Sequence, residues 1–312
     1  MEELFSEVSR LYEIKIKRAA RDKAGFVCGA ESGDLRLTKI PSETSHIMFQ
    51  HGIKEKLFER GFSRTDRFYL NSEGLPYFSF GGDNFALTEA YAVCEDRFSD
   101  AGRFMELVKT LAEMNGRLFG EDLSAYAPEF RPPAKNRAEI YRGLKRVISK
   151  KTRLSDFDVI FLRNYEYFLG AITFWDSFDK ESDRESFCHN LLKEENVYGA
   201  GDGPVIANFS ECGPGSSVAD LAAIIKRYFS RAAGSPGLNI LDIVERYNSE
   251  RPLGPGELRR LYAELVFPDK FFKIVTQFYE KKRSWVPANF IDRLNAAVAA
   301  KDAYAGFIKP LA

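Results

Sequence analysis

Residues 188–211 read CHNLLKEENVYGAGDGPVIANFSE and contain two short segments of strand character around a glycine-rich turn, GAGDG. His189 stands near the start of this stretch, and Asn196 follows seven residues later. Asn208 comes after the second segment. Glycines at such a turn favour a tight β-hairpin. The stretch therefore predicts a small hairpin with polar side chains beside it, in a half of the chain that is otherwise helical.

The N-terminal side of the chain is rich in strand signals. Apolar and polar residues alternate in residues 12–17 and again in LRLTKI (35–40). Turn residues occur at DKAG (22–25) and SGD (32–34). After a short N-terminal helix, these signals predict a three-stranded antiparallel meander.

The residues that follow predict one helix and then further strands. The helix spans residues 42–61 and begins at the cap residues Ser42 and Thr44. Its apolar residues lie at helical spacing: Ile47, Met48, Ile53 and Leu57. Residues 67–91 then give strand–turn–strand signals, with turns at NSEG and FGGDN.

Helical patterns dominate from Ser99 onward. Helices are expected over 103–120, in a basic stretch over 138–151, in a long segment capped by Ser155, and in a segment that begins at Asp220. Three more helical stretches are expected in the rest of the chain, which is punctuated by Pro252, Pro268 and Pro287.

Together the two halves predict an α+β fold with two lobes. Residues 1–91 form a small lobe with an antiparallel β-sheet and one helix, and residues 92–312 form a large, mostly helical lobe. This is the plan of protein-kinase-like phosphotransferases, in which a nucleotide lies between the lobes and the connecting segment borders the adenine. The change of pattern places that segment at Thr88, Glu89, Ala90 and Tyr91.

Composition excludes several classes of function. Lys+Arg and Asp+Glu both total 45, and this balance argues against a dedicated nucleic-acid-binding protein. No apolar run approaches the roughly 20 residues that span a bilayer, and the acidic start, MEELFSEVSR, lacks a signal segment, so we expect synthesis in the cytoplasm and no membrane partner. The four cysteines and three histidines do not have the spacing of a metal cluster.

Several stretches resemble the CotS family of spore-coat proteins, distant relatives of aminoglycoside phosphotransferases and choline kinases. LAEMNGRLFG (111–120) and SVADLAAIIKRYF (217–229) are similar to two helices of that family. LRRLYAELVFPDKFFKIVTQFYEKKRSW (258–285) is similar to its characteristic ending and is the most specific of these stretches. The resemblance covers nearly the whole chain. It implies a kinase-like fold and a place in the coat of a bacterial endospore.

The resemblance assigns roles in phosphoryl transfer to positions where this chain has other residue types. His189 and Asn196 match the family's catalytic loop, Asn196 at the place of an Asn that holds metal. Leu191 stands at the place of the catalytic Asp, where it can neither accept a proton nor hydrogen-bond a hydroxyl. Asn208 stands at the place of a metal-binding Asp and Ser210 at that of a second acid. A neutral amide is a poorer ligand for Mg²⁺ than a carboxylate.

The positions that the family uses to bind nucleotide, in the cleft between the two lobes, also carry other residue types here. Thr38 stands where the family has a phosphate-anchoring Lys, and the side chain of the adjacent Lys39 is expected on the other face of the strand. The DKAG turn has a single glycine, Gly25, where a glycine-rich loop is expected. Asp220 is expected to cap its helix and brace the catalytic loop. Three bulky residues could fill the cleft: Leu191, Tyr198 and Phe209.

These replacements predict a pseudokinase: a catalytically inactive kinase-like protein that needs no cofactor and serves as a structural or recruiting component of the spore coat. Asn196 and Asn208 are then vestigial metal positions. One alternative is an active phosphotransferase that uses ATP and Mg²⁺, with Glu194, Glu195 or Glu211 in the role of the displaced acid. Another is a nucleotide-sensing regulator that binds without Mg²⁺ through the connecting segment.

Residues 131–153 carry nine Lys or Arg and one acid, Glu139. This stretch is either a solvated helix face or a docking site for an acidic partner. The resemblance implies other spore-coat proteins as partners, with synthesis in the mother cell and a final place in the coat. Trp175 and Trp285 have helical spacing with other apolar residues and are expected in the core.

Overall fold

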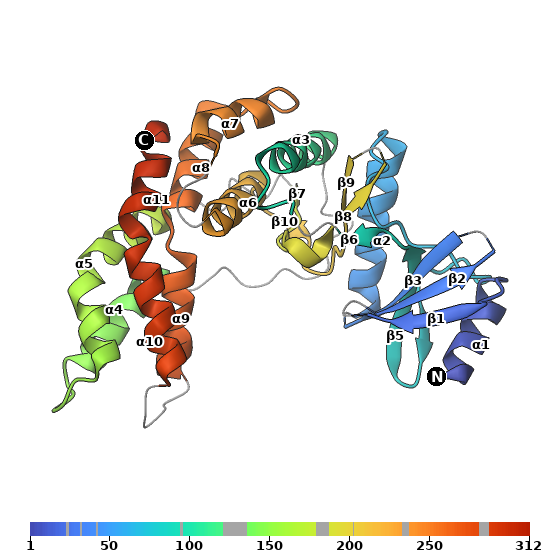
Figure 1. The fold of residues 1–312 in the computed structure, drawn as a ribbon, viewed down its shortest axis with the longest axis horizontal. Coiled ribbons are helices and arrows are strands. Elements are labelled where there is room, and N and C mark those ends of the chain that lie inside the picture. Colours follow the sequence, from blue (N-terminus) through green and yellow to red (C-terminus); the bar gives the residue numbers. More distant parts are fainter. Residues whose placement is uncertain are drawn as a thin grey trace. The chain divides into compact units, whose positions relative to one another are not determined.

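The computed structural model describes residues 1–22, 25–31, 33–41, 43–93, 96–120, 136–178, 187–201, 203–232, 237–280 and 287–312. The chain divides into two compact units, drawn in Figure 1. The first comprises Met1–Phe130, Asp183–Asp220 and Ser249–Arg251, and the second comprises Arg131–Ser182, Leu221–Asn248 and Pro252–Ala312. All the candidate residues of the predicted cleft belong to the first unit.

One five-stranded antiparallel sheet dominates the N-terminal part of the first unit, and it confirms the predicted meander. Its strands, in spatial order, are β1 (Arg18–Arg21), β2 (Phe26–Ala30), β3 (Gly33–Ile40), β5 (Asp83–Glu89) and β4 (Phe78–Phe80). A two-residue turn joins β4 to β5. Both of its residues, Gly81 and Gly82, have positive φ, at 60° and 84°, which is why glycine is required there.

Residues 12–17 do not form the predicted first strand: β1 begins at Arg18. Tyr12, Ile14 and Ile16 are half-buried against the apolar cluster of the sheet. The alternation of residue types therefore reflects burial on one side of the segment, and bonding to β2 starts only at its end, where the backbone N–H of Lys17 donates to the oxygen of Gly29 at 2.9 Å.

Two helices cover the sheet. On one face, Val8 of α1 (Glu2–Leu11) packs in a cluster with Leu35 and Leu37 of β3. On the other face, Ile40 of β3 packs with Ile47 of α2 (Thr44–Glu59). Successive residues of β3 thus serve different layers, as the side-chain alternation of a strand requires. Figure 1 shows the two helices on either side of the strands.

Two predicted details of α2 are wrong. The residue at its N-cap is Glu43, and Thr44 already lies inside the helix; Ser42 lies outside the described residues. Met48, predicted on the apolar side of the helix, is 44% exposed.

The rest of the first unit contains the predicted hairpin. It consists of β8 (Val197–Ala200) and β9 (Gly203–Ile206), and β8 also pairs with β6 (Ala92–Val93). A 3₁₀ turn, η2 (Glu194–Asn196), precedes β8, and β7 (Phe187–Cys188) pairs with β10 (Gly213–Pro214). The helix α3 (Ala101–Arg117) contacts β9. The helix α6 (Ser217–Arg231) begins three residues before the predicted start at Asp220.

The second unit is helical, as expected. Its helices are α4 (Arg137–Ile148), α5 (Asp156–Asp176), the part of α6 from Leu221 onward, α7 (Ile240–Asn248), α8 (Pro255–Val266), α9 (Asp269–Glu280), α10 (Ala288–Ala299), α11 (Lys301–Ile308) and the short η3 (Lys309–Leu311). Beyond α6 the described residues thus hold five α-helices instead of the three predicted. Ser155 caps α5, as predicted, and also forms a capping box with Asp158.

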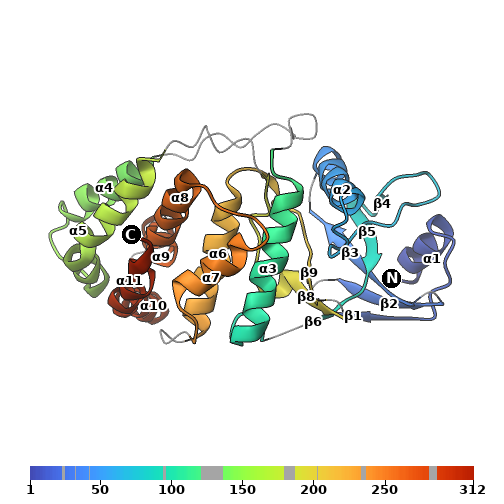
Figure 2. The ribbon, with the colours of Figure 1, turned by 90° about the horizontal axis from the view of Figure 1, so that it is seen from above.

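The core of the second unit is aromatic. The rings of Tyr141 and Tyr165 stack with centroids 5.0 Å apart, and those of Phe168 and Phe271 stack at 3.7 Å. These residues bring together α4, α5 and α9, of which α4 and α5 lie side by side in Figure 2. Trp175 is buried in this core, as predicted, whereas Trp285 lies outside the described residues.

Candidate active site

His189 lies directly after β7 and is completely buried. Its Nε2 lies 3.1 Å from the backbone oxygen of Ala207 and donates to it, because a carbonyl oxygen can only accept. Its Nδ1 accepts the backbone N–H of Leu191 at 3.2 Å. Burial lowers the pKa of His189 to about 3, so the ring is neutral. Both ring nitrogens are engaged by the backbone, and His189 holds the loop in place.

Asp220 holds the same loop from the start of α6. Its carboxylate oxygens accept the backbone N–H groups of His189 at 2.6 Å and Asn190 at 2.9 Å. Since α6 starts at Ser217, Asp220 lies inside the first turn, and the prediction that it begins the helix as a cap is wrong. Burial raises the pKa of Asp220 to about 6, although the two backbone donors oppose that shift. The predicted bracing of the loop corresponds to these two hydrogen bonds.

Leu191 occupies the position that the resemblance assigns to the catalytic acid. Its backbone oxygen accepts from the side chain of Asn196 at 2.7 Å, so its main chain belongs to the loop's hydrogen bonds while its side chain offers only carbon. Of the acids proposed to replace it, Glu195 is exposed and pairs with Lys193 at 2.5 Å. Glu211 is also exposed, and its backbone oxygen accepts from the side chain of Asn190 at 3.0 Å. Glu194 is half-buried in η2.

The two candidate metal ligands bind each other. The side-chain amide of Asn208 donates to Oδ1 of Asn196 at 3.1 Å. Asn208 has a φ of 62°, in the left-handed region that Asn tolerates better than most residues, and its Oδ1 accepts the backbone N–H of Ser210 at 3.4 Å. Every side-chain oxygen of this pair is neutral and already accepts a hydrogen bond. The residues present therefore do not fit a Mg²⁺ ion, which prefers anionic oxygen ligands.

A charged pair that the sequence did not indicate lies beside these amides. Lys54 of α2 is completely buried, and its Nζ lies 2.8 Å from Oδ1 of Asp66 and donates to the backbone oxygen of Asp66 at 2.8 Å. Oδ2 of Asp66 accepts the backbone N–H of Asn208 at 3.0 Å. The signal that could have revealed Lys54 is its spacing: His46, Gln50 and Lys54 recur every four residues on a helix with buried apolar neighbours.

Thr38 and Lys39 lie on opposite faces of β3. Lys39 is exposed and pairs with Asp83 at 2.7 Å. Thr38 shares its face with Arg36, which is 8% exposed. The guanidinium of Arg36 lies 2.7 Å from a carboxylate oxygen of Asp22.

The guanidinium of Arg36 also lies 5.5 Å from the centre of the Tyr198 ring. Tyr198 is 7% exposed and belongs to an apolar cluster that Tyr91 of the connecting segment joins. Phe209 is buried, with its ring 4.7 Å from that of His189. Side chains of the protein itself therefore occupy the space beside the connecting segment and beside the catalytic loop.

The connecting segment is engaged in hydrogen bonds of its own. The backbone N–H of Ala90 donates to the backbone oxygen of Asp34 at 3.0 Å. The hydroxyl of Tyr91 donates to the carboxylate of Glu89 at 3.0 Å. Thr88 is buried, and its hydroxyl donates to the backbone oxygen of Glu89 at 3.2 Å. The structure thus brings Thr88, Glu89 and Tyr91 into the same unit as the catalytic loop, as the fold requires.

Two other kinds of site are absent from the described residues. Within the described ranges, no three His, Cys, Asp or Glu side chains are grouped so that they could hold a metal ion. None of the described helices is both long and apolar enough to cross a membrane.

Three solved structures that share this fold are described as phosphotransferases or a kinase. An aminoglycoside phosphotransferase from Alicyclobacillus acidocaldarius matches with a TM-score of 0.78 and 19% identity, over 97% of this chain and 93% of that one. The amicoumacin kinase hAmiN, solved with AMP-PNP, Ca²⁺ and Ami, matches with a TM-score of 0.60 and 13% identity, over 98% and 93% of the two chains. Spectinomycin phosphotransferase, solved with ADP and spectinomycin, matches with a TM-score of 0.56 and 13% identity, over 96% and 98%.

These similarities show the fold alone: it is the two-lobed protein-kinase-like α+β fold that the sequence predicted. A search of curated proteins gave no match. The family model described as "Spore coat putative kinase YutH" matches residues 6–311, almost the whole chain. The protein therefore belongs to the spore coat putative kinase YutH family, in keeping with the resemblance to spore-coat proteins.

Proposed function

We propose that this protein is a non-catalytic kinase-like component of the spore coat, with a structural or recruiting role. One observation carries the proposal: the side chains of Asn196 and Asn208, at the two metal positions, are neutral and hydrogen-bonded to each other at 3.1 Å. Phosphoryl transfer depends on metal ions that neutralise the charge developing on the phosphate. With Leu191 at the position of the catalytic acid, the loop offers neither the metal ligands nor the base.

Thermal denaturation with ATP or ADP, with and without Mg²⁺, tests the catalytic half of the proposal. A ligand at 100 times its Kd adds about 2.7 kcal/mol to stability. At about 2.1 cal/mol/K of unfolding entropy per residue, a chain of 312 residues then melts about 4 °C higher. We expect no shift with either nucleotide. A shift that requires Mg²⁺ would contradict the proposal and favour an active phosphotransferase; a shift of equal size without Mg²⁺ would favour nucleotide sensing.

The coat role is tested in spores. We expect spores that lack this protein to lose one or more coat proteins, which a protein inventory of purified coats measures. Leu191→Ala is expected to restore the full inventory, because the hydrogen bonds of Leu191 in the loop are made by its main chain. If deletion leaves the coat unchanged, the protein is not a recruiting component.

The acidic partner proposed for residues 131–153 meets competition from the protein's own carboxylates. Within the described part of that stretch, Arg146 pairs with Glu139 at 2.6 Å, Lys145 with Glu166 at 3.0 Å and Lys151 with Asp158 at 2.7 Å. A partner that binds here has to displace these acids. Its binding should weaken with salt, because the pairs of Arg146 and Lys145 are solvent-exposed, whereas the Asp158 carboxylate that pairs with Lys151 is buried.

A further inference from the structure

One face of helix α2 carries polar side chains although it is turned towards the interior. Lys54 is completely buried and Gln50 is 2% exposed, while His46, two turns earlier than Lys54, bonds to another part of the unit. Buried lysines are rare, because removing an ammonium group from water is costly unless a carboxylate compensates. The position of Lys54 therefore requires an explanation.

The ammonium group of Lys54 lies in a nearly complete cage. Asp66 supplies a carboxylate oxygen and a backbone oxygen, both 2.8 Å from Nζ. The ring centre of Phe68 lies 3.7 Å from Nζ, and that of Phe209 lies 5.3 Å away. Burial lowers the pKa of Lys54, and the neighbouring Asp66 carboxylate opposes that shift. The cage thus consists of one counter-charge and two aromatic rings, the groups that hold a cation away from water.

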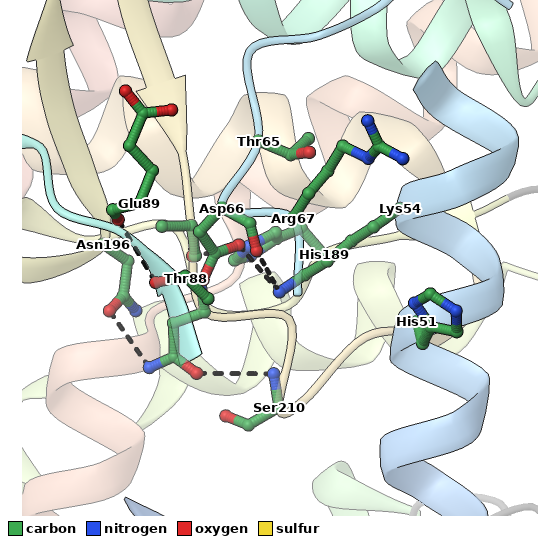
Figure 3. A network of polar contacts seen from close by, with 12 residues as sticks. His51, Lys54, Thr65, Asp66, Arg67, Thr88, Glu89, His189, Asn196 and Ser210 are labelled. Carbon is green, nitrogen blue, oxygen red and sulfur yellow. Dashed lines mark hydrogen bonds and ion pairs between the residues drawn. The ribbon is translucent and has the colours of Figure 1, made fainter. Parts of the chain in front are cut away.

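The same carboxylate joins the helix to the loop that carries Asn208. Oδ2 of Asp66 accepts the backbone N–H of Asn208 at 3.0 Å, while Oδ1 faces Lys54. His46 makes a second connection: its Nε2 donates to the backbone oxygen of Ser210 at 2.8 Å. Two residues of α2, eight positions apart, therefore fix residues 208–210, one through Asp66 and one directly. Figure 3 shows Lys54 extending from α2 to Asp66.

We propose that Lys54 is a built-in cation that does within the chain what a bound divalent metal does in a phosphotransferase: it neutralises a carboxylate at the loop and orders that loop against the helix. The metal positions at Asn196 and Asn208 have no negative charge to offer, whereas Asp66, one contact away, has one, and Lys54 balances it. The loop 208–210 is then held in one arrangement with no nucleotide or metal bound. Lys54 and Asp66 are positioning residues, and the inference stands whether or not the coat role is correct.

The test uses four variants of the full chain. For each one we measure the melting temperature and the hydrogen exchange of residues 207–212. Lys54→Met leaves the partly buried Asp66 carboxylate without its counter-charge, and Asp66→Asn leaves the buried Lys54 ammonium without its counter-charge. Each variant should lower the melting temperature by about 5 °C. The matched control is Lys39→Met, which removes an exposed pair of nearly the same length, 2.7 Å to Asp83, and should lower the melting temperature by about 1.5 °C at most. The double variant Lys54→Met/Asp66→Asn leaves no unpaired charge and should melt above either single variant.

Hydrogen exchange separates a positioning role from mere packing. In the double variant the Asn208 amide bonds to a neutral acceptor instead of a charged one, and its exchange should be about tenfold faster than in the unmodified protein although the melting temperature recovers. Exchange in the unmodified protein should be the same in 10 mM Mg²⁺ and in EDTA. The double variant also serves if a single variant does not fold.

Three results would overturn the inference. The first is that residues 207–212 exchange in the double variant as slowly as in the unmodified protein. The second is that the melting-temperature loss of the double variant equals the sum of the losses of the two single variants. The third is that exchange in the unmodified protein slows when Mg²⁺ is supplied. None of these measurements involves nucleotide. A result that contradicts the inference about Lys54 can therefore be distinguished from one that contradicts the proposed function.

Discussion

Replacing Asn208 by Asp returns a carboxylate to the metal position and tests whether its absence excludes Mg²⁺. The backbone should accept the change, because Asp, like Asn, tolerates the φ of 62° found there. The substitution removes the donor that satisfies Oδ1 of Asn196 at 3.1 Å. It also adds a negative charge beside Asp66, to which the backbone N–H of residue 208 donates at 3.0 Å.

The expected loss of stability follows from these contacts. One neutral hydrogen bond contributes about 0.5–1.5 kcal/mol, and leaving the buried oxygen of Asn196 without a donor costs about 1–3 kcal/mol. Since one term partly contains the other, we expect a loss of about 2 kcal/mol for N208D in EDTA. At about 2.1 cal/mol/K per residue over 312 residues, this lowers the melting temperature by about 3 °C.

Mg²⁺ should recover most of that loss in the variant alone. The carboxylate introduced by N208D would offer an anionic oxygen and Asn196 an oxygen freed from its former donor, the kind of ligand set that Mg²⁺ prefers. With a Kd of about 1 mM, 10 mM Mg²⁺ stabilises the folded state by about 1.4 kcal/mol, or about 2 °C. The unmodified protein should show no such gain.

Asn190→Asp is the matched control. Asn190 has a φ of 64°, gives its backbone N–H to a carboxylate, that of Asp220, and donates its side-chain amide at 3.0 Å. N190D therefore makes the same chemical change in the same kind of surroundings, away from Asn196. Calorimetry at equal ionic strength should show that N190D has a lower melting temperature than the unmodified protein in EDTA, and that Mg²⁺ does not raise it. An equal Mg²⁺ response in both variants, or a response of the unmodified protein, would refute the argument that the amide at 208 is what excludes the metal.

Two further predictions concern stability alone. Burial lowers the pKa of His189 to about 3, so between about pH 3 and 6.5 the unfolded chain binds more protons than the folded one, and His189 makes the free energy of unfolding rise with pH. Burial raises the pKa of Asp220 to about 6, so between about pH 4 and 6 the folded chain binds more protons, and Asp220 makes the free energy of unfolding fall with pH. Chemical denaturation of the unmodified protein and of H189Q should therefore show a stability difference that grows by about 3 kcal/mol from pH 4 to 6.5, and a constant difference would contradict the neutral, buried imidazole. S155A removes the cap of α5, where Ser155 accepts the backbone N–H of Asp158, and should lower the melting temperature by about 1.5 °C. The control S149A removes an exposed hydroxyl that donates to the Lys145 carbonyl, and should change the melting temperature by less than about 0.8 °C. Equal melting temperatures for these two variants would show that the capping box does not contribute.

The features that were predicted correctly from the sequence are those that local chemistry determines. Ser155 with an acid three residues later predicts a helix start wherever it stands, and the structure has the complete capping box. The glycine pair at 81–82 permits only a few turns between strands, and the β4–β5 hairpin has one of them. The hairpin of β8 and β9 is local in the same sense.

The features that were missed depend on partners far away in the chain. Residues 12–17 alternate like a strand, but they pack on a core, and their bonding to β2 starts only at Lys17, whose backbone N–H donates to the oxygen of Gly29 at 2.9 Å. Lys54 looks like a solvent-facing helix residue until Asp66, twelve residues on, and Phe209, far beyond both, close around it. The bond between Asn196 and Asn208 likewise exists only because a hairpin brings two loops together. A single sequence contains the residues of such contacts but not the distances between them.

The contacts that hold the loops do not depend on the side chains at the positions that the resemblance assigns to the catalytic acid and the phosphate-anchoring lysine. The catalytic loop is fixed by backbone bonds to Asp220 and to the ring of His189, and residue 208 is fixed by a backbone bond to Asp66. None of these bonds uses the side chains at 191 or 38. The loop's support therefore does not depend on which side chains stand at 191 and 38, whereas the side chain of Asn208 has a partner in Asn196. A substitution at Asp220, His189, Lys54 or Asp66 should therefore harm folding more than one at Leu191 or Thr38.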